Sequence, residues 1–226
     1  MGVHNGHRDR LRQRFLEYGL DNFNELNALE LLLFFSIPRR DTNPIAHALL
    51  DRFGSLKGIF TASPQELCQV EGVGESTAAL LRLVPQLVKK SMTAQTERAR
   101  SINNSEEAGD YLIPRFMFEE DEVVLLLCLD SQRRVISCTE MGRGVVNSVE
   151  TSVRRMVETA LKCKATSVIL AHNHPDGVAL PSAEDNAVTR QMSSAFALVG
   201  IQLADHIIVA GEDFVSYRDS GSLCLL

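Results

Sequence analysis

The chain has 226 residues, of which 45% are hydrophobic and 23% are charged, and its formal net charge is −6. Such a composition is typical of a globular protein in water and can fill one large hydrophobic core or two small ones. It excludes an integral membrane protein, because no apolar run approaches the roughly 18 residues of a spanning helix, and the polar, charged N-terminus contains no apolar signal segment.

Helical patterns follow one another along the first 92 residues. Apolar side chains recur every three or four residues, and arginines occupy the opposite side of the first segment. Ser63 and Glu66 have the spacing of a capping box, and Pro44 suits the first turn of a helix that Thr42 or Asn43 can cap. The expected helices cover residues 8–19, 24–35, 42–53, 63–69 and 75–90, and a short one begins near residue 55.

Gly72 and Gly74 lie in a tight turn between two of these helices, so this part of the chain resembles a helix-hairpin-helix. Glycines let successive backbone N–H groups face a phosphate at a helix N-terminus, which favours weak, non-specific DNA binding through residues 1–92. Glu71 and Glu75 flank the turn and favour the alternative, a helix connection without a ligand. Both interpretations stay open at this point.

The charges divide unevenly along the chain. Residues 1–92 carry 11 Lys or Arg and 10 Asp or Glu residues, whereas residues 93–226 carry 12 and 19. Because an acidic segment repels nucleic acid, any DNA contact is expected in the first 92 residues, where arginines gather at positions 8, 10, 12 and 14.

Polar residues dominate positions 93–104, which we interpret as a linker or a solvated helix extension between a helical domain, residues 1–92, and a second domain, residues 105–226. The second domain carries strand patterns with interposed helix patterns, which is typical of an α/β or α+β fold. Strands are expected over residues 122–129, 135–139, 140–146, 167–171, 205–210 and 214–217, and helices over residues 105–112, 148–163 and 184–198.

A candidate metal site lies where the strand at 167–171 ends. His172 and His174 follow this strand, and residues at i and i+2 of an extended segment point to the same side. Asp185 comes eleven residues after His174, at the start of the next helical pattern. Two imidazole nitrogens and a carboxylate oxygen suit a catalytic Zn²⁺ whose fourth position is left to water, with the pKa of that water lowered to about 7. An isolated His-x-His is more often a surface pair or a satisfied polar pair, but Pro175 and the returning carboxylate strengthen the metal interpretation.

The spacing of these residues also resembles a known family. His172-x-His174-Pro175, followed by Ser182 and then by Asp185, resembles the JAMM motif of JAB/MPN+ metalloproteases. The surrounding Ser167–Gly177 and Asp205–Val209 resemble the RadC branch, and the resemblance extends over nearly the whole chain. It implies an α/β (α+β) MPN/JAB-like C-terminal domain with a smaller all-α N-terminal domain. The sequence departs from the branch pattern at residues that are not metal ligands, which are Val145, Val153 to Arg155, and Asp176.

A general base is needed beside the attacking water, and Glu122 is our candidate. It stands at the start of a long apolar strand, where a charged residue is out of pattern, and it matches the position of the catalytic Glu that the resemblance implies. Glu119, Glu120 and Asp121 are adjacent competitors, because an acidic run before a strand is also a common solvated feature.

Ser182 has two candidate tasks. Ser182-x-x-Asp185 before a helix is a capping box by sequence, whereas the resemblance implies that the hydroxyl donates to the oxyanion of a tetrahedral intermediate. A hydroxyl can do both, since it accepts at its lone pairs and donates its one proton, but an Asp185 that binds metal is not expected to complete the box. Asp205 and His206 form a further polar pair, which is either structural or orients a ligand histidine through its carboxylate.

The leading hypothesis is therefore a zinc-dependent hydrolase of amide bonds, a metallopeptidase or isopeptidase that acts on a peptide or protein substrate. The first alternative is a DNA-associated protein, of the repair type traditionally attributed to the RadC branch, in which the second domain is a non-catalytic scaffold. A metal-dependent enzyme that acts on a nucleic-acid bond is disfavoured by the acidic charge of residues 93–226. Five scattered cysteines without a CxxC pair indicate reduced thiols and a cytoplasmic location, with no membrane contact.

Overall fold

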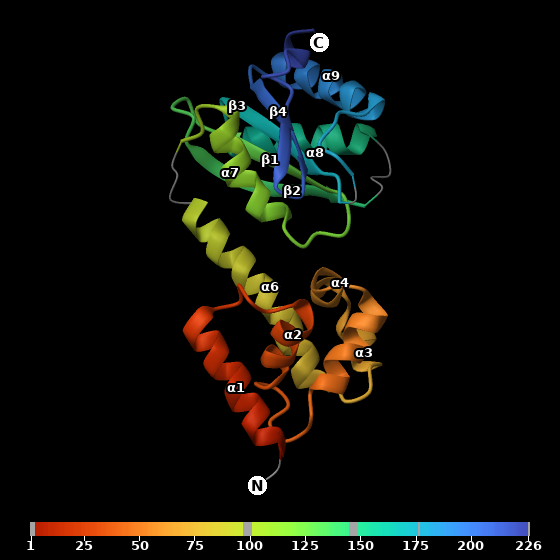
Figure 1. Ribbon diagram of the computed structural model, residues 1–226. Coiled ribbons are helices and arrows are strands. Elements are labelled where there is room, and N and C mark those ends of the chain that lie inside the picture. Colours follow the sequence, from red (N-terminus) through yellow and green to blue (C-terminus); the bar gives the residue numbers. More distant parts are fainter. Residues whose placement is uncertain (1–2, 97–100, 145–148, 176, 226) are drawn as a thin grey trace. The chain divides into compact units, whose positions relative to one another are not determined.

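The computed structural model describes residues 3–96, 101–144, 149–175 and 177–225, and the chain divides into two compact units, Met1–Val88 and Lys89–Leu226. The first unit is helical and the second is mixed α/β, which confirms the predicted fold class (Figure 1). Helix α6 (Glu75–Thr96) continues past residue 92, so the first part of the polar segment is a helix extension. The boundary predicted within residues 93–104 stays a prediction, because residues 97–100 lie outside the described part.

The helices of the first unit begin where their capping residues stand. The side chain of Asn24 accepts a hydrogen bond from the Asn27 backbone at 2.8 Å, and Ser63 and Glu66 form the predicted capping box. Thr42 precedes α3 but its hydroxyl makes no capping bond. The helices are α1 (Val3–Tyr18), α2 (Glu25–Leu33), α3 (Asn43–Phe53), α4 (Leu56–Thr61), α5 (Pro64–Cys68) and α6.

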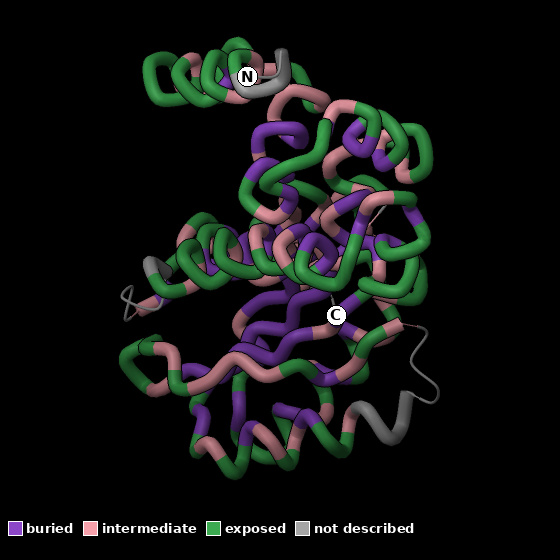
Figure 2. The backbone as a smooth tube through the Cα atoms, turned by 90° about the horizontal axis from the view of Figure 1, so that it is seen from below, coloured by how far each residue is buried: buried purple, intermediate pink, exposed green. Residues whose placement is uncertain are grey.

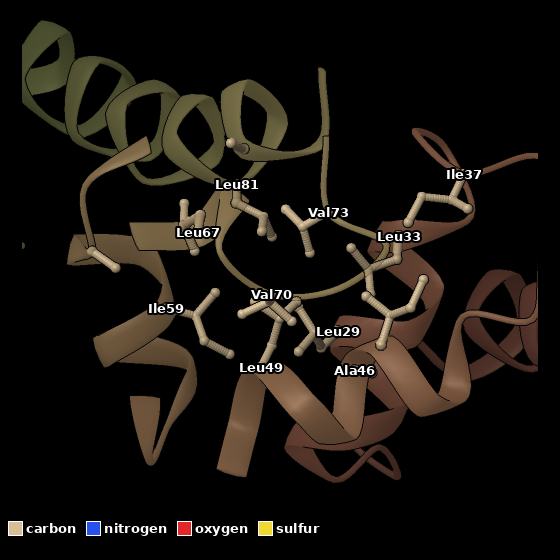
Figure 3. Close-up of a cluster of buried hydrophobic side chains, with 13 residues drawn as sticks. Leu29, Leu33, Ile37, Ala46, Leu49, Ile59, Leu67, Val70, Val73 and Leu81 are labelled. Carbon is tan, nitrogen blue, oxygen red and sulfur yellow. The ribbon is translucent and has the colours of Figure 1, made fainter. Parts of the chain in front are cut away.

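One cluster of apolar side chains holds the first unit together. Figure 3 shows Leu29 and Leu33 of α2, Leu49 of α3 and Leu81 of α6 converging on it. Each of these leucines is at most 1% exposed, and full burial of such a side chain stabilises a fold by about 1.5–3 kcal/mol. Val73, between the two hairpin glycines, also packs into the cluster. The glycine turn is therefore part of the core and not a loose loop.

Gly72 and Gly74 play different structural roles. Gly72 has φ +89°, and a Cβ there would lie 2.7 Å from Cδ1 of Ile45. We expect Gly72→Ala to lower the free energy of unfolding by about 1–2 kcal/mol, the cost of a left-handed backbone for an L-residue. The control is Gly74→Ser. A Cβ at Gly74 meets no described atom within 4 Å, its carbonyl accepts from Ala78 N, and serine is a preferred N-cap. Urea denaturation of both variants checks this; equal losses would contradict it.

A five-stranded sheet forms the centre of the second unit, in the order β2-β1-β3-β4-β5. β1 pairs antiparallel with both β2 and β3, whereas β3 and β4 are parallel and are connected through α9. A parallel pair requires such a crossover, and it returns a helix N-terminus to the end of β3. The strands are β1 (Val123–Leu129), β2 (Val135–Arg143), β3 (Ser167–Asn173), β4 (Gln202–Ala210) and β5 (Asp213–Ser216).

Helices cover both faces of this sheet, giving three layers (Figure 1). Helix α7 packs against the face that presents Leu127, Ile169 and Ile207, while α8 and α9 pack against the face of Leu126 and Leu170. Because both faces are covered, every residue of β3 is buried and the inner strands appear purple in Figure 2. The helices are α7 (Ser105–Phe116), α8 (Val149–Lys162) and α9 (Ala183–Leu198), followed by the short 3₁₀ helix η1 (Ser222–Leu225).

One predicted element of the second unit is wrong. β2 runs unbroken from Val135 to Arg143, so no separate strand begins at residue 140. The reason is a bulge. Val124 pairs with Gly142 and Leu125 with Glu140, which leaves Met141 as an extra residue and lets the strand continue. Positions 145 and 146 of the expected strand lie outside the described residues.

None of the described helices combines the length and the apolar content that a bilayer crossing requires.

Candidate metal centre

Two histidines reach the site from the end of β3. His172 lies within the strand, is 3% exposed, and shares its sheet face with Leu170, beneath α8 and α9. His174 lies one residue beyond the strand, where its backbone N–H donates to Val209 O at 2.8 Å and so continues the pairing with β4. Both rings turn to the same side, and their Nε2 atoms are 3.0 Å apart.

The first turn of α9 supplies the carboxylate. Asp185 Oδ1 lies 3.1 Å from His172 Nε2, and Oδ2 lies 3.7 Å from His174 Nε2. Ligand atoms of these three residues all lie within 4.8 Å of one another. The structure thus brings together His172, His174 and Asp185, the three predicted ligands.

Ser182 and Asp185 also complete the capping box, contrary to the expectation that a ligating Asp185 is unavailable for it. Ser182 N–H donates to Asp185 Oδ2 at 2.8 Å, and Asp185 N–H donates to Ser182 Oγ at 3.0 Å. The carboxylate can serve both purposes because its second oxygen, Oδ1, faces the histidines. Burial would raise the pKa of Asp185, but the hydrogen bonds from the His172 ring and from Ser182 outweigh it and hold that pKa well below its usual range. The carboxylate is therefore ionised, as a ligand must be.

The donor set fits a divalent metal ion such as zinc. The carbonyl of Val178 can only accept a hydrogen bond, and it lies 3.1 Å from His174 Nδ1. That nitrogen therefore carries a proton, so in the neutral form that a metal requires, Nε2 of His174 presents the lone pair toward the cluster. Two imidazoles and one carboxylate, partly open to solvent, form the donor set of catalytic zinc sites.

Glu122 immediately precedes β1, and the strand register predicts the side to which it turns. Val124 is the partner of His172 in the antiparallel β1–β3 pair, so continuing the alternation by two residues would put Glu122 on the face that carries the histidines. Glu122 is exposed, and its carboxylate has no hydrogen-bond or ion-pair partner among the described residues.

The competing acidic residues are not equivalent to Glu122. The Glu119 carboxylate binds Lys89 and Arg143. Burial would raise its pKa, but hydrogen bonds from these two cations outweigh burial and lower it. Asp121 offers its backbone carbonyl to the Asn173 amide. That bond uses the backbone and not the carboxylate of Asp121, so Glu120 and Asp121, which are both exposed, stay alternatives to Glu122.

Asn173, the residue between the two histidines, was not singled out from the sequence. Its side chain turns to the other side of the strand, accepts from Val123 N–H at 2.7 Å and donates to Asp121 O at 3.1 Å. These two bonds hold the backbone on both sides of Glu122. The only sequence signal is an amide at the centre of the His-x-His, in an otherwise apolar strand.

The pair Asp205–His206 divides into two roles. Asp205 is bound by Ser216 Oγ at 2.6 Å and by the backbone N–H groups of His206 and Arg218, and does not reach a candidate ligand. The ring of His206, in contrast, lies 2.9 Å from Nδ1 of His172. Burial, reinforced by the His172 ring, lowers the pKa of His206 to about 3, so this ring is neutral. Asp205 is therefore a satisfied structural group, as the first of the two interpretations had it, and the contact with His172 is made by the ring of His206 and not by a carboxylate.

Comparisons with known proteins match two family models and several relatives to this chain. A family model described as the RadC-like JAB domain matches residues 102–222, and a helix-hairpin-helix motif matches residues 55–84. A UPF0758 protein of Bordetella avium is 36% identical over 212 residues, which is 94% of both chains. A UPF0758 protein of Ruegeria pomeroyi is 34% identical over 217 residues, or 96% of this chain and 97% of the relative. One from Shewanella loihica is 32% identical over 93% of both chains.

Proposed function

The chain belongs to the RadC-like JAB domain family, and from that premise we propose that its second unit is a zinc-dependent hydrolase of amide bonds, a metallopeptidase or isopeptidase. The observation that carries the proposal is the convergence of His172, His174 and Asp185 within 4.8 Å at the end of β3. A zinc ion held by these donors supplies Lewis acidity and a water molecule whose pKa is lowered to about 7.

The remaining chemistry belongs to residues of the chain. We assign the general base to Glu122, whose unpartnered carboxylate takes the proton of the attacking water and later delivers it to the leaving amine. Ser182 Oγ accepts from Asp185 N–H, so its own proton is available for the oxyanion that forms on the substrate carbonyl. Glu119 is unsuited to the role of base because two cations stabilise its charged form.

Zinc content and amide hydrolysis of the full chain test this function. We expect about one zinc per chain, as the three-donor site requires. Quenched fluorescent peptides, together with peptides linked through a lysine side chain, should release free amine. A chelator should stop the release and added zinc should restore it. If the protein holds one zinc per chain but cleaves neither kind of peptide, the result would support a non-catalytic scaffold instead of a hydrolase.

A second candidate function, binding of duplex DNA by the first unit, is favoured by the helix-hairpin-helix match. A surface depression beside the hairpin is lined by Arg39, Arg40, Gly72 and Gly74. Both arginines are exposed. Gly74 leads into α6, and within the described part of the chain no backbone acceptor engages the first N–H groups of this helix, which could therefore meet a phosphate. The proposed contact surface is therefore this depression.

Two of the four arginines at the start of the chain make contacts within the first unit, so fewer of them are available to bind DNA than the sequence indicated. Arg8 donates to the carbonyls of Ile37 and Pro38, and its guanidinium lies over the Phe34 ring. Arg14 lies over the Phe23 ring. These cations therefore hold the first unit together, and Arg39 and Arg40 are better placed for phosphate contacts.

The full chain should bind duplex DNA weakly, with a Kd on the order of 10⁻⁴–10⁻⁶ M at physiological salt. Replacing Arg39 and Arg40 with alanine should weaken binding and reduce the slope of log K against log salt by up to about 1.8, because two phosphate contacts are lost. Fluorescence anisotropy over a salt series measures both quantities. The control replaces Arg154 and Lys162, two cations of α8 in the second unit. An equal effect of the control pair would show that only net charge matters.

A further inference from the structure

A buried histidine lies directly behind the metal centre, and the proposed function does not use it. His206 is 1% exposed, comes from β4, and is not among the three residues that could hold a metal. Its ring stacks on Tyr217, with centroids 4.8 Å apart and planes 16° from parallel. A second polar residue, Thr189 of α9, is fully buried beside it. Burial of this pair requires that each polar atom find a partner.

The polar atoms of His206 and Thr189 form a continuous series of hydrogen-bond contacts behind His172. Nδ1 of His172 lies 2.9 Å from Nε2 of His206, and Nδ1 of His206 lies 2.6 Å from Oγ1 of Thr189. Oγ1 of Thr189 lies 2.5 Å from the backbone carbonyl of Asp185. This series of contacts therefore runs from the ring of His172 to the backbone carbonyl of Asp185, which are both candidate ligands.

The two ligand histidines are oriented by different means. Nδ1 of His174 faces the carbonyl of Val178, which fixes its tautomer directly. Nδ1 of His172 faces another imidazole nitrogen, which can donate or accept. Without a metal, Nε2 of His172 donates to Oδ1 of Asp185, 3.1 Å away, and a bound ion would take the place of that proton. His172 would then present its lone pair at Nε2 and carry its proton on Nδ1, which requires that Nε2 of His206 be an acceptor. The tautomer of His206 therefore decides whether His172 is competent as a ligand.

Thr189 can fix the tautomer of His206. A carbonyl oxygen cannot donate, so the contact with Asp185 O engages the single hydroxyl proton of Thr189 and leaves its lone pairs to accept from His206 Nδ1–H. A neutral imidazole has one donor and one acceptor nitrogen, so Nε2 of His206 is then bare and accepts from His172 Nδ1–H. We propose that His206 and Thr189 are positioning residues that hold His172 in its metal-binding tautomer through this hydrogen-bond relay.

The inference rests on the proposed metal centre, and zinc affinity of hydroxyl variants tests it. Thr189→Val keeps the shape of the side chain but removes the acceptor for His206 Nδ1–H, so a buried donor loses its partner. We expect zinc binding of Thr189→Val to weaken on the order of 10- to 100-fold, as found for partners of metal-bound histidines. Thr189→Ser keeps the hydroxyl and should bind zinc like the wild type. Competition with a chromophoric chelator measures the affinities.

A second pair of variants tests His206 itself. Glutamine can place an acceptor oxygen near the position of Nε2, whereas leucine cannot, so His206→Gln should bind zinc more tightly than His206→Leu. Circular dichroism of each variant shows whether it folds. Ring ¹⁵N NMR of the zinc-loaded wild type supplies an independent readout, which a purely packing role would not move. It should show His206 protonated at Nδ1 and bare at Nε2.

The outcomes separate this inference from the function beneath it. A wild type that binds no zinc overturns the metal centre and the relay together. A wild type that binds zinc, with equal affinity in Thr189→Val and Thr189→Ser, overturns the relay alone. A zinc-loaded protein in which His206 carries its proton on Nε2 does the same.

Discussion

Replacing His174 with alanine should abolish zinc binding while the second unit stays folded. The ring supplies one of three donors, and its loss leaves two, which is fewer than catalytic zinc sites use. The fold should tolerate the change because the side chain of His174 is 23% exposed and lies beyond the end of β3. Its backbone bond to Val209 O remains. The ring gives up its contact with Val178 O, so we expect the free energy of unfolding of the metal-free protein to fall by about 1 kcal/mol or less, the typical net contribution of one hydrogen bond.

Elemental analysis and thermal denaturation of the metal-free form check this prediction together. Glu184→Ala is the matched control, because Glu184 is an exposed carboxylate next to Asp185 that does not belong to the cluster. It should keep about one zinc per chain. Equal zinc content in His174→Ala and in the wild type would remove His174 from the ligand set.

The second large effect concerns the general base. Glu122→Gln should retain zinc but lower the rate of amide hydrolysis by about 10²- to 10⁴-fold, because the amide cannot take the proton of the attacking water. Glu122 lies outside the cluster of three candidate ligands, so affinity for the metal should not follow the loss of rate. Parallel measurements of kcat and of bound zinc separate the two effects.

Glu120→Gln is the matched control for this substitution, since both carboxylates are exposed and stand two residues apart. It should hydrolyse substrate at nearly the wild-type rate. If Glu120→Gln is inactive and Glu122→Gln is active, the base has been assigned to the wrong carboxylate. If both are fully active, neither Glu120 nor Glu122 is the base, and Asp121 is the next exposed carboxylate to replace.

The three candidate ligands could be predicted from sequence because each lies at the end of a local element. An apolar strand followed by His172 and His174 places two rings on one side, and a capping pattern places Asp185 in the first turn of a helix. The fold class followed from the same local periodicities. Neither the ligand prediction nor the fold class depends on which strands are neighbours in the sheet.

Features that depend on strand neighbours could not be predicted in this way. His206 meets His172 only because β4 lies parallel to β3 with Leu170 opposite His206, which puts both rings on one face. The sequence did show a polar residue, His206, within the apolar run of β4, but it did not show which residue His206 contacts. The continuous β2 was missed for a similar reason, since the bulge at Met141 exists only relative to β1.

Val145 and Asp176, where the sequence departs from the family pattern, lie outside the described residues.

The amide of Asn173 has a consequence for how the site responds to its substrate. One tripeptide, His172 to His174, carries two candidate ligands and also ties down the backbone around Glu122. The candidate base and the candidate metal ligands are thereby joined through the sheet itself, so their spacing would be established during folding and would cost little further conformational entropy when substrate arrives. Such a site would be rigid at its catalytic centre. Its selectivity would then reside in the surrounding segments, which can change without altering the chemistry.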